Sequence, residues 1–150
     1  MKSTFYLIVA LFLFSCEDSE MLTQNEVPSM RYGTSFGECV GYCLTDLEVS
    51  AEQVYYVSYG WHNSQTPKTH TVTFTSEKYN HLLSLFDQDK FLALDPVIGC
   101  PDCADGGSEW IEMTIGTRTK KVTFEYLKDI DPIAPLIDEL RNLTKEVKVD

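Results

Sequence analysis

Basic residues are scarce in this chain. It has 12 Lys and Arg against 23 Asp and Glu in 150 residues, which gives a formal net charge of −11 at pH 7. Such a chain lacks the positive surface through which proteins bind nucleic acid or anionic lipid headgroups. We therefore expect no nucleic-acid partner and no electrostatic attachment to a membrane.

The sequence also lacks the short motifs typical of common enzyme classes. It contains no GxSxG, P-loop, HExxH or GxGxxG pattern. Its three histidines, His62, His70 and His81, are too far apart in the sequence to share the spacing of metal ligands. We therefore expect no cofactor and no metal, and the sequence identifies no catalytic residue.

Long apolar runs are scarce as well, and the one present lies near the start of the chain. Residues 5–14 are ten consecutive apolar residues, the length of a signal-peptide core and too short to span a bilayer. Residues 13–16 (LFSC) resemble the bacterial lipobox, with Phe14 where a small residue is usual. The resemblance implies that residues 1–15 are a signal peptide and that Cys16 carries several anchoring acyl chains. The alternative is an ordinary secretory signal with a chance cysteine.

The segment behind Cys16 is polar and acidic. Residues 17–20 read Glu-Asp-Ser-Glu, which is similar to the surface-export signals of some Gram-negative lipoproteins. We expect residues 16–29 to be the lipidated cysteine and a flexible tether, and residues 30–150 to form a single domain. The expected location is the outer membrane, reached through the lipid anchor, with the domain either periplasmic or surface-exposed.

Alternating apolar residues predict strands near residues 43–49, 54–61, 69–75, 109–115 and 122–126. An apolar stripe with helical spacing follows Ser76 and another follows Asp131, which predicts two helices with these residues as N-caps. Three strands, a helix, two strands and a helix are typical of an α+β fold. We expect an antiparallel sheet of about five strands with two helices packed on one face.

Four cysteines remain after Cys16 is set aside, in a C-x3-C and a C-x2-C pattern: Cys39, Cys43, Cys100 and Cys103. An exported protein favours disulfides, and a four-thiolate zinc site or a redox-active pair are the alternatives. Closing a loop of about sixty residues restricts the unfolded chain by about 4 kcal/mol, against about 2 kcal/mol for a loop of four. We therefore expect two disulfides that join one pattern to the other. Turn-forming residues after Cys103 disfavour a thioredoxin-like site.

Two short stretches resemble known exported proteins. Residues 36–42 (FGECVGY) resemble the FGxCPxY opening of a bacterial domain family of unknown function, with Val40 in the place of its proline. Residues 99–112 (GCPDCADGGSEWIE) are similar to a stretch of uncharacterised exported lipoproteins. The resemblance supports the expected fold and location, and it implies no mechanism.

Aromatic and acidic residues near the cysteine stretch are candidates for a binding surface: Asp102, Asp105, Glu109, Trp110, Tyr59 and Trp61. Packing of the aromatic rings in the core is the favoured interpretation, and a binding surface requires that one face be exposed. An exposed surface of this composition suits an envelope protein or a glycan as the partner. We expect a non-catalytic binding or assembly module of the cell envelope. The alternative is a thiol-dependent or metal-dependent envelope enzyme centred on Cys100 and Cys103.

Overall fold

The computed structural model of the protein describes residues 28–148. The predicted signal peptide, the predicted lipidation site Cys16 and nearly all of the predicted tether lie outside the described residues. Among residues 28–148, no helix combines the length and the apolar composition that crossing a bilayer requires.

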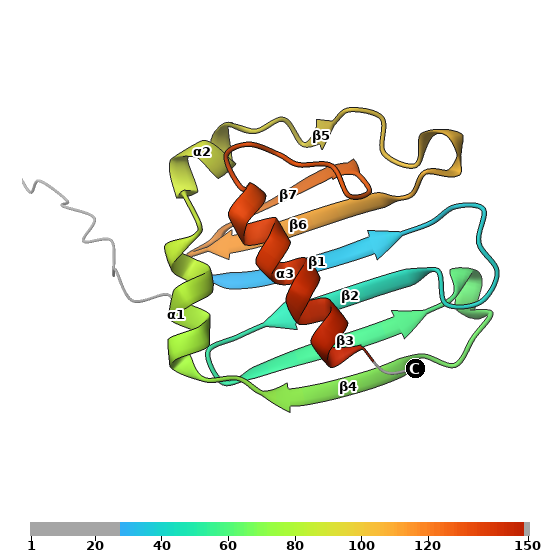
Figure 1. The fold of residues 1–150 in the computed structure, drawn as a ribbon, viewed down its shortest axis with the longest axis horizontal. Coiled ribbons are helices and arrows are strands. Elements are labelled where there is room, and N and C mark those ends of the chain that lie inside the picture. Colours follow the sequence, from blue (N-terminus) through green and yellow to red (C-terminus); the bar gives the residue numbers. More distant parts are fainter. Residues whose placement is uncertain (1–27, 149–150) are drawn as a thin grey trace, which may run out of the picture.

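One sheet organises the domain. Its strands are β1 (Ser29–Ser35), β2 (Leu44–Val49), β3 (Gln53–Tyr59), β4 (Lys68–Thr73), β5 (Val97–Ile98), β6 (Ser108–Ile115) and β7 (Arg118–Glu125). They lie side by side in the order β4-β3-β2-β1-β6-β7-β5 (Figure 1). All neighbours are antiparallel except β5, which runs parallel to β7. β1 therefore lies in the middle and joins β2–β4 to the β6–β7 hairpin.

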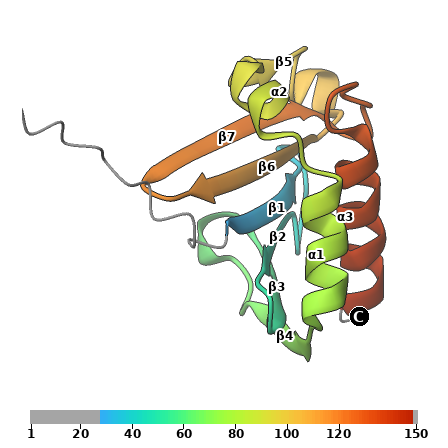
Figure 2. The same cartoon turned by 90° about the vertical axis from the view of Figure 1, so that its left-hand side faces the viewer.

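Helices cover one face of this sheet. They are α1 (Ser76–Ser84), α2 (Gln88–Ala93) and α3 (Ala134–Val147). α1 and α3 lie on the same side of the sheet, and none of the helices in the described part of the chain lies on the opposite side (Figure 2). The sheet thus has a covered face and an open face, and the two faces have different chemistry.

The core lies between the sheet and the two larger helices. Every second residue of β1 and β6 points into it, as Met30, Tyr32, Ile111 and Met113 are each at most 2% exposed. α3 contributes a stripe of buried apolar residues, Leu136, Ile137, Leu140, Leu143 and Val147. Apolar residues recur every second position in the strands and about every 3.6 positions in α3. Each element therefore has one apolar surface, and the two surfaces pack against each other.

The α+β class and the mostly antiparallel sheet are confirmed, but the expected number of about five strands is wrong. The sheet has seven strands, and the two additional ones are β1 and β5. β1 contains Arg31 and Gly33, which weaken its local strand pattern, and pairing with β2 and β6 on both sides stabilises it instead. β5 is two residues long, which is too short for a periodic signal. α2 is a third helix, whereas two helices were expected.

Two predicted helix caps are displaced. The N-cap of α1 is Thr75 rather than Ser76, and its side chain accepts a hydrogen bond of 3.3 Å from the Lys78 amide. α3 begins at Ala134 after Ile133, with no side-chain cap, so Asp131 does not have the predicted role. Pro135 lies in the first turn of α3, where its missing N–H has no helical partner to lose.

Candidate functional site

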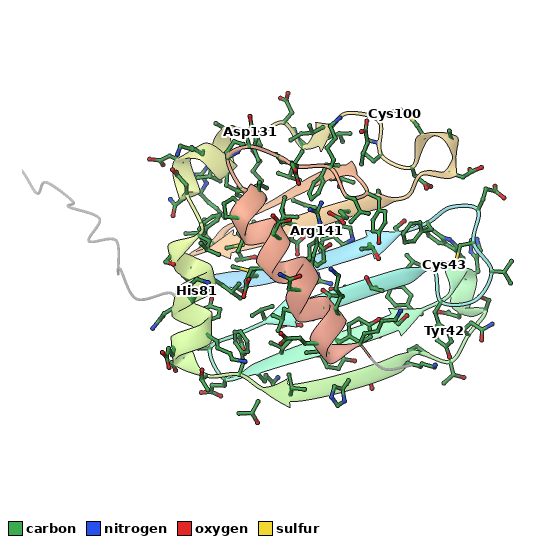
Figure 3. All side chains as sticks on the ribbon, in the orientation of Figure 1. Tyr42, Cys43, His81, Cys100, Asp131 and Arg141 are labelled. Atoms are coloured by element: carbon green, nitrogen blue, oxygen red, sulfur yellow. A yellow bond between two sulfur atoms is a disulfide. The ribbon has the colours of Figure 1, made fainter. Side chains whose placement is uncertain are left out.

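The four cysteines of the domain form two disulfides, Cys39–Cys43 and Cys100–Cys103. Each bond joins cysteines within one pattern, with Cα atoms 5.6 Å and 5.5 Å apart, so the predicted pairing between the patterns is wrong. Local turns hold each pair at bonding distance, whereas the loop-entropy figures describe how much an existing bond stabilises the fold and do not identify which cysteines pair. Cys43 and Cys100 lie at the same end of the sheet but in separate loops (Figure 3).

Non-covalent contacts join the two cysteine loops. The Asp102 carboxylate accepts hydrogen bonds from the amides of Gly37, at 3.3 Å, and Gly107, at 3.2 Å. The Phe36 ring packs edge-on against Tyr126 with centroids 4.8 Å apart. Gly107 has a φ of +78°, and a Cβ there would touch the Phe36 ring, so this contact requires glycine. Asp102 therefore connects the two loops.

The Cys100–Cys103 disulfide does not lie at the start of an α-helix. The residues after it form a short 3-10 turn, Cys103–Asp105, in which Ala104 has a φ of 51°. A thioredoxin-like thiol depends on a helix N-terminus to lower its pKa, and this turn lacks that geometry. Instead, Glu125 accepts a 2.9 Å hydrogen bond from the Cys100 amide, which together with Lys128 lowers the pKa of the Glu125 carboxyl.

The six predicted binding residues lie in three different environments. Asp102, Asp105 and Trp61 belong to the loops, and the Trp61 indole N–H donates to the Phe36 carbonyl at 2.8 Å. Met30 and Tyr32 of β1 point into the core, so Gly33 and Ser35 belong to the open face. Trp110 is paired with Gly33, and Tyr59 lies in line with Ser35 across β2, so both also lie on the open face. Glu109 points to the covered face and is fully buried. The structure therefore does not bring these six residues together into one site.

Trp110 lies at the centre of the open face, among charged side chains that the sequence did not identify. The Lys121 ammonium lies over its ring, 3.8 Å from the ring centroid, and the Arg31 guanidinium carbon is 5.5 Å from the centroid. Arg31 also forms ion pairs with Asp46 and, at 3.2 Å, with Glu112. We call these five residues, Arg31, Asp46, Trp110, Glu112 and Lys121, the open-face cluster.

Gly33 explains why the indole can lie flat on the sheet. It is the partner of Trp110 in the β1–β6 register. A Cβ at Gly33 would lie only 2.5 Å from Cζ2 of Trp110, and it would also overlap the carbonyl oxygen of Thr45. Because glycine carries no Cβ, the ring occupies the space above the β1 backbone, a close approach that other residues would block.

The open-face cluster is partly desolvated. Burial lowers the pKa of Lys121, whereas burial and the charge of Asp46 raise the pKa of Tyr59. Burial acts to lower the pKa of Arg31, but the carboxylates of Asp46 and Glu112 outweigh this effect and raise it. The cluster thus pairs Arg31 with two carboxylates and holds Lys121 over the Trp110 ring. This arrangement suits recognition by apolar contact and hydrogen bonds.

A second charged group lies on the covered face. The fully buried carboxylate of Glu109 pairs with Arg141 of α3 at 2.8 Å, and Figure 3 shows Arg141 near the middle of that helix. Arg141 also donates to Asp138 at 2.9 Å and to the Lys128 carbonyl at 3.0 Å. Burial and the charge of Glu109 raise the pKa of Tyr32 beside it. The sequence does contain a signal for the burial of Glu109. It lies two residues before Ile111 on the same strand, so both side chains point to the covered face.

Within residues 28–148, no three His, Cys, Asp or Glu side chains are grouped as ligands for a metal ion. A scan against protein-family models and a search of curated proteins both find no match for this chain.

Proposed function

We propose that the protein is a lipid-anchored, non-catalytic module of the outer membrane that binds an envelope protein through its open face. One observation carries the proposal: Trp110 and Arg31 lie at the centre of a sheet face that no helix of residues 28–148 covers. Tryptophan, tyrosine and arginine are the residues that most often dominate binding energy at protein interfaces. All three types are present here, with Tyr59 at the edge of the same face.

The cluster favours a protein partner over a glycan. A sugar ring stacks on an aromatic ring whose face is free, but the Lys121 ammonium lies 3.8 Å from the centre of the Trp110 ring. Arg31 is already paired with two carboxylates, which matches the satisfied charges found in protein interfaces. A partner protein can cover this whole arrangement without displacing Lys121.

The anchor and the tether support a partner within the envelope. The LFSC stretch resembles a lipobox, and residues 17–29 are the predicted tether. Ser29 belongs to β1, so the predicted flexible part is at most the twelve residues 17–28, and a flexible chain of that length has a mean end-to-end distance of about 19 Å. A domain held this close to the membrane meets other membrane-anchored or membrane-embedded proteins at a high effective concentration.

Cys16→Ala is expected to abolish incorporation of labelled palmitate and to move the protein from the membrane fraction to the soluble fraction. The reason is that the thiol of Cys16 is the predicted attachment site for the lipid. The Cys39→Ala/Cys43→Ala variant is the control, since it also removes cysteine but leaves the lipobox intact. Equal labelling of wild type and Cys16→Ala contradicts the proposed anchor.

Lys121→Glu is expected to weaken binding to the partner about tenfold, because it reverses a charge in direct contact with Trp110. The partner is first identified with a photo-crosslinking residue in place of Val57 on the open face, and binding to the purified partner is then measured. Lys78→Glu is the matched control, since Lys78 lies on α1, behind the sheet, and it is expected to change affinity less than twofold.

Three outcomes contradict the proposal. One is crosslinking from α1 to the same partner with equal yield. Another is saturable binding of the open face to envelope polysaccharide alone, which makes the partner a glycan. The third is turnover of a disulfide substrate that Cys100→Ser abolishes, which makes the protein a thiol enzyme.

A further inference from the structure

A small cavity lies on the covered face, between the sheet and the second half of α3. Its volume is about 200 Å³, and its lining includes the Glu109–Arg141 ion pair together with Tyr32, Thr34, Thr45, Tyr56, Lys145 and Lys148. The sheet separates it from Trp110 and Lys121, which lie on the open face. Any ligand of this cavity is therefore independent of a partner bound to the open face.

Tyr56 is the unusual residue of this cavity. Its side chain is 0% exposed, and its hydroxyl has no hydrogen-bond partner among residues 28–148. Buried hydroxyl groups are almost always hydrogen-bonded, because an unpaired one keeps the full cost of losing water. A phenylalanine at this position would fill the same space without that cost. Within residues 28–148, the hydroxyl of Tyr56 thus has no protein group as its partner.

The rest of the lining offers further hydroxyls and positive charge. The Thr34 and Thr45 hydroxyls are 2.8 Å apart, so one of them donates to the other and spare hydrogen-bonding capacity remains. Burial and the nearby Glu109 raise the pKa of Tyr32, which keeps its hydroxyl neutral. Lys145 and Lys148 are exposed at the rim. Arg141 lines the cavity but offers no free donor, because it already donates to Glu109, Asp138 and the Lys128 carbonyl.

We propose that this cavity binds a small hydroxylated anion, of the class of the sugar acids. The Tyr56 hydroxyl bonds to a ligand hydroxyl, and Lys145 and Lys148 attract the carboxylate at the rim. A water molecule in the liquid occupies about 30 Å³, so a cavity of about 200 Å³ has the volume of about seven waters, which suits one six-membered sugar ring. Lys145 also lies in the last turn of α3, where its charge stabilises the helix. Replacing it would change both stability and binding, so the test uses Tyr56 instead.

D-Glucuronate is the probe, with D-glucose as its neutral analogue and acetate as an anion without hydroxyls. We expect saturable binding of glucuronate to the wild-type domain in an NMR titration, with affected amides along β3 and the second half of α3. Glucose is expected to bind more weakly, because it lacks the carboxylate. Tyr56→Phe is expected to weaken glucuronate binding at least tenfold, since it removes only the hydroxyl.

Tyr55→Phe is the matched control. Tyr55 is the neighbouring residue on β3 and points to the open face, so the same chemical change there is expected to leave glucuronate binding unchanged within twofold. The melting temperature of Tyr56→Phe without ligand is expected to equal or exceed that of the wild type, because the lost hydroxyl has no partner within residues 28–148. This readout separates a loss of binding from a loss of folding.

Four results overturn the proposal. They are no saturable binding of glucuronate, equal binding of acetate and glucuronate, equal binding of glucuronate by Tyr56→Phe and wild type, and a lower melting temperature of unliganded Tyr56→Phe. The last result would mean that the hydroxyl has a structural partner in solution. None of the four bears on Lys121 or the open face, so the proposed partner binding is tested separately.

Discussion

Arg141→Met is expected to lower the free energy of unfolding by about 3–5 kcal/mol, the range measured when one partner of a buried ion pair is removed. Glu109 is 0% exposed, and three of the hydrogen bonds to its carboxylate come from Arg141. The only other one comes from the Leu127 amide at 3.3 Å, within the described part of the chain. Without the guanidinium, the carboxylate is left charged and nearly unpaired in the interior.

Urea denaturation of three variants measures this effect. Arg118→Met is the matched control, since Arg118 is exposed at the start of β7, and it is expected to change stability by less than about 0.5 kcal/mol. Glu109→Leu/Arg141→Met is expected to recover most of the loss, because apolar residues of similar size often replace a buried ion pair without net cost. If Arg141→Met unfolds within about 1 kcal/mol of the wild type, the ion pair does not stabilise the fold as described.

Gly33→Ala is expected to lower the free energy of unfolding by about 3 kcal/mol, at the upper end of the range for overpacked sites. The added Cβ overlaps both the Trp110 ring and the Thr45 carbonyl oxygen, and the second of these belongs to the backbone of a paired strand. The ring can rotate away, but the carbonyl cannot move without disturbing the β1–β2 hydrogen bonds. The Lys121–Trp110 contact is therefore expected to be lost with the stability, which fluorescence of the indole can follow.

Gly106→Ala separates this steric effect from the general effect of replacing glycine. Gly106 has a φ of −71°, and a Cβ there meets only the Cys103 carbonyl oxygen, at 3.2 Å. The change is expected to alter stability by less than about 1 kcal/mol in either direction. Equal stability losses for Gly33→Ala and Gly106→Ala would contradict the proposed role of Gly33.

Local patterns were sufficient to predict most of the covered face. The alternation in β3 and β6 and the stripe of Leu136 and Leu140 depend on neighbouring residues alone, so they can be seen in the sequence. β1 could not be predicted in this way, because its neighbours β2 and β6 lie far apart in the chain and supply the hydrogen bonds that stabilise it. Long-range pairing decided its structure.

The candidate site was predictable only in part for the same reason. Trp110 and Tyr59 could be named from their residue types, but Arg31, Asp46 and Lys121 could not. These three come from β1, β2 and β7: the register of β1 with β2 and β6 places Arg31 and Asp46 near Trp110, and the β6–β7 register places Lys121 there. The disulfide pairing could not be predicted from loop length, because the local distance between the cysteines decides it.

The position of β1 has a mechanical consequence for a protein held by its amino terminus. β1 begins at Ser29, the last residue of the predicted tether, and pairs with six residues of β2 and seven residues of β6. With the proposed anchor and the proposed partner in place, tension between the two enters the domain at its middle strand rather than at an edge. A pull along β1 loads the hydrogen bonds on both sides in shear, so they must break together before the strand slides out.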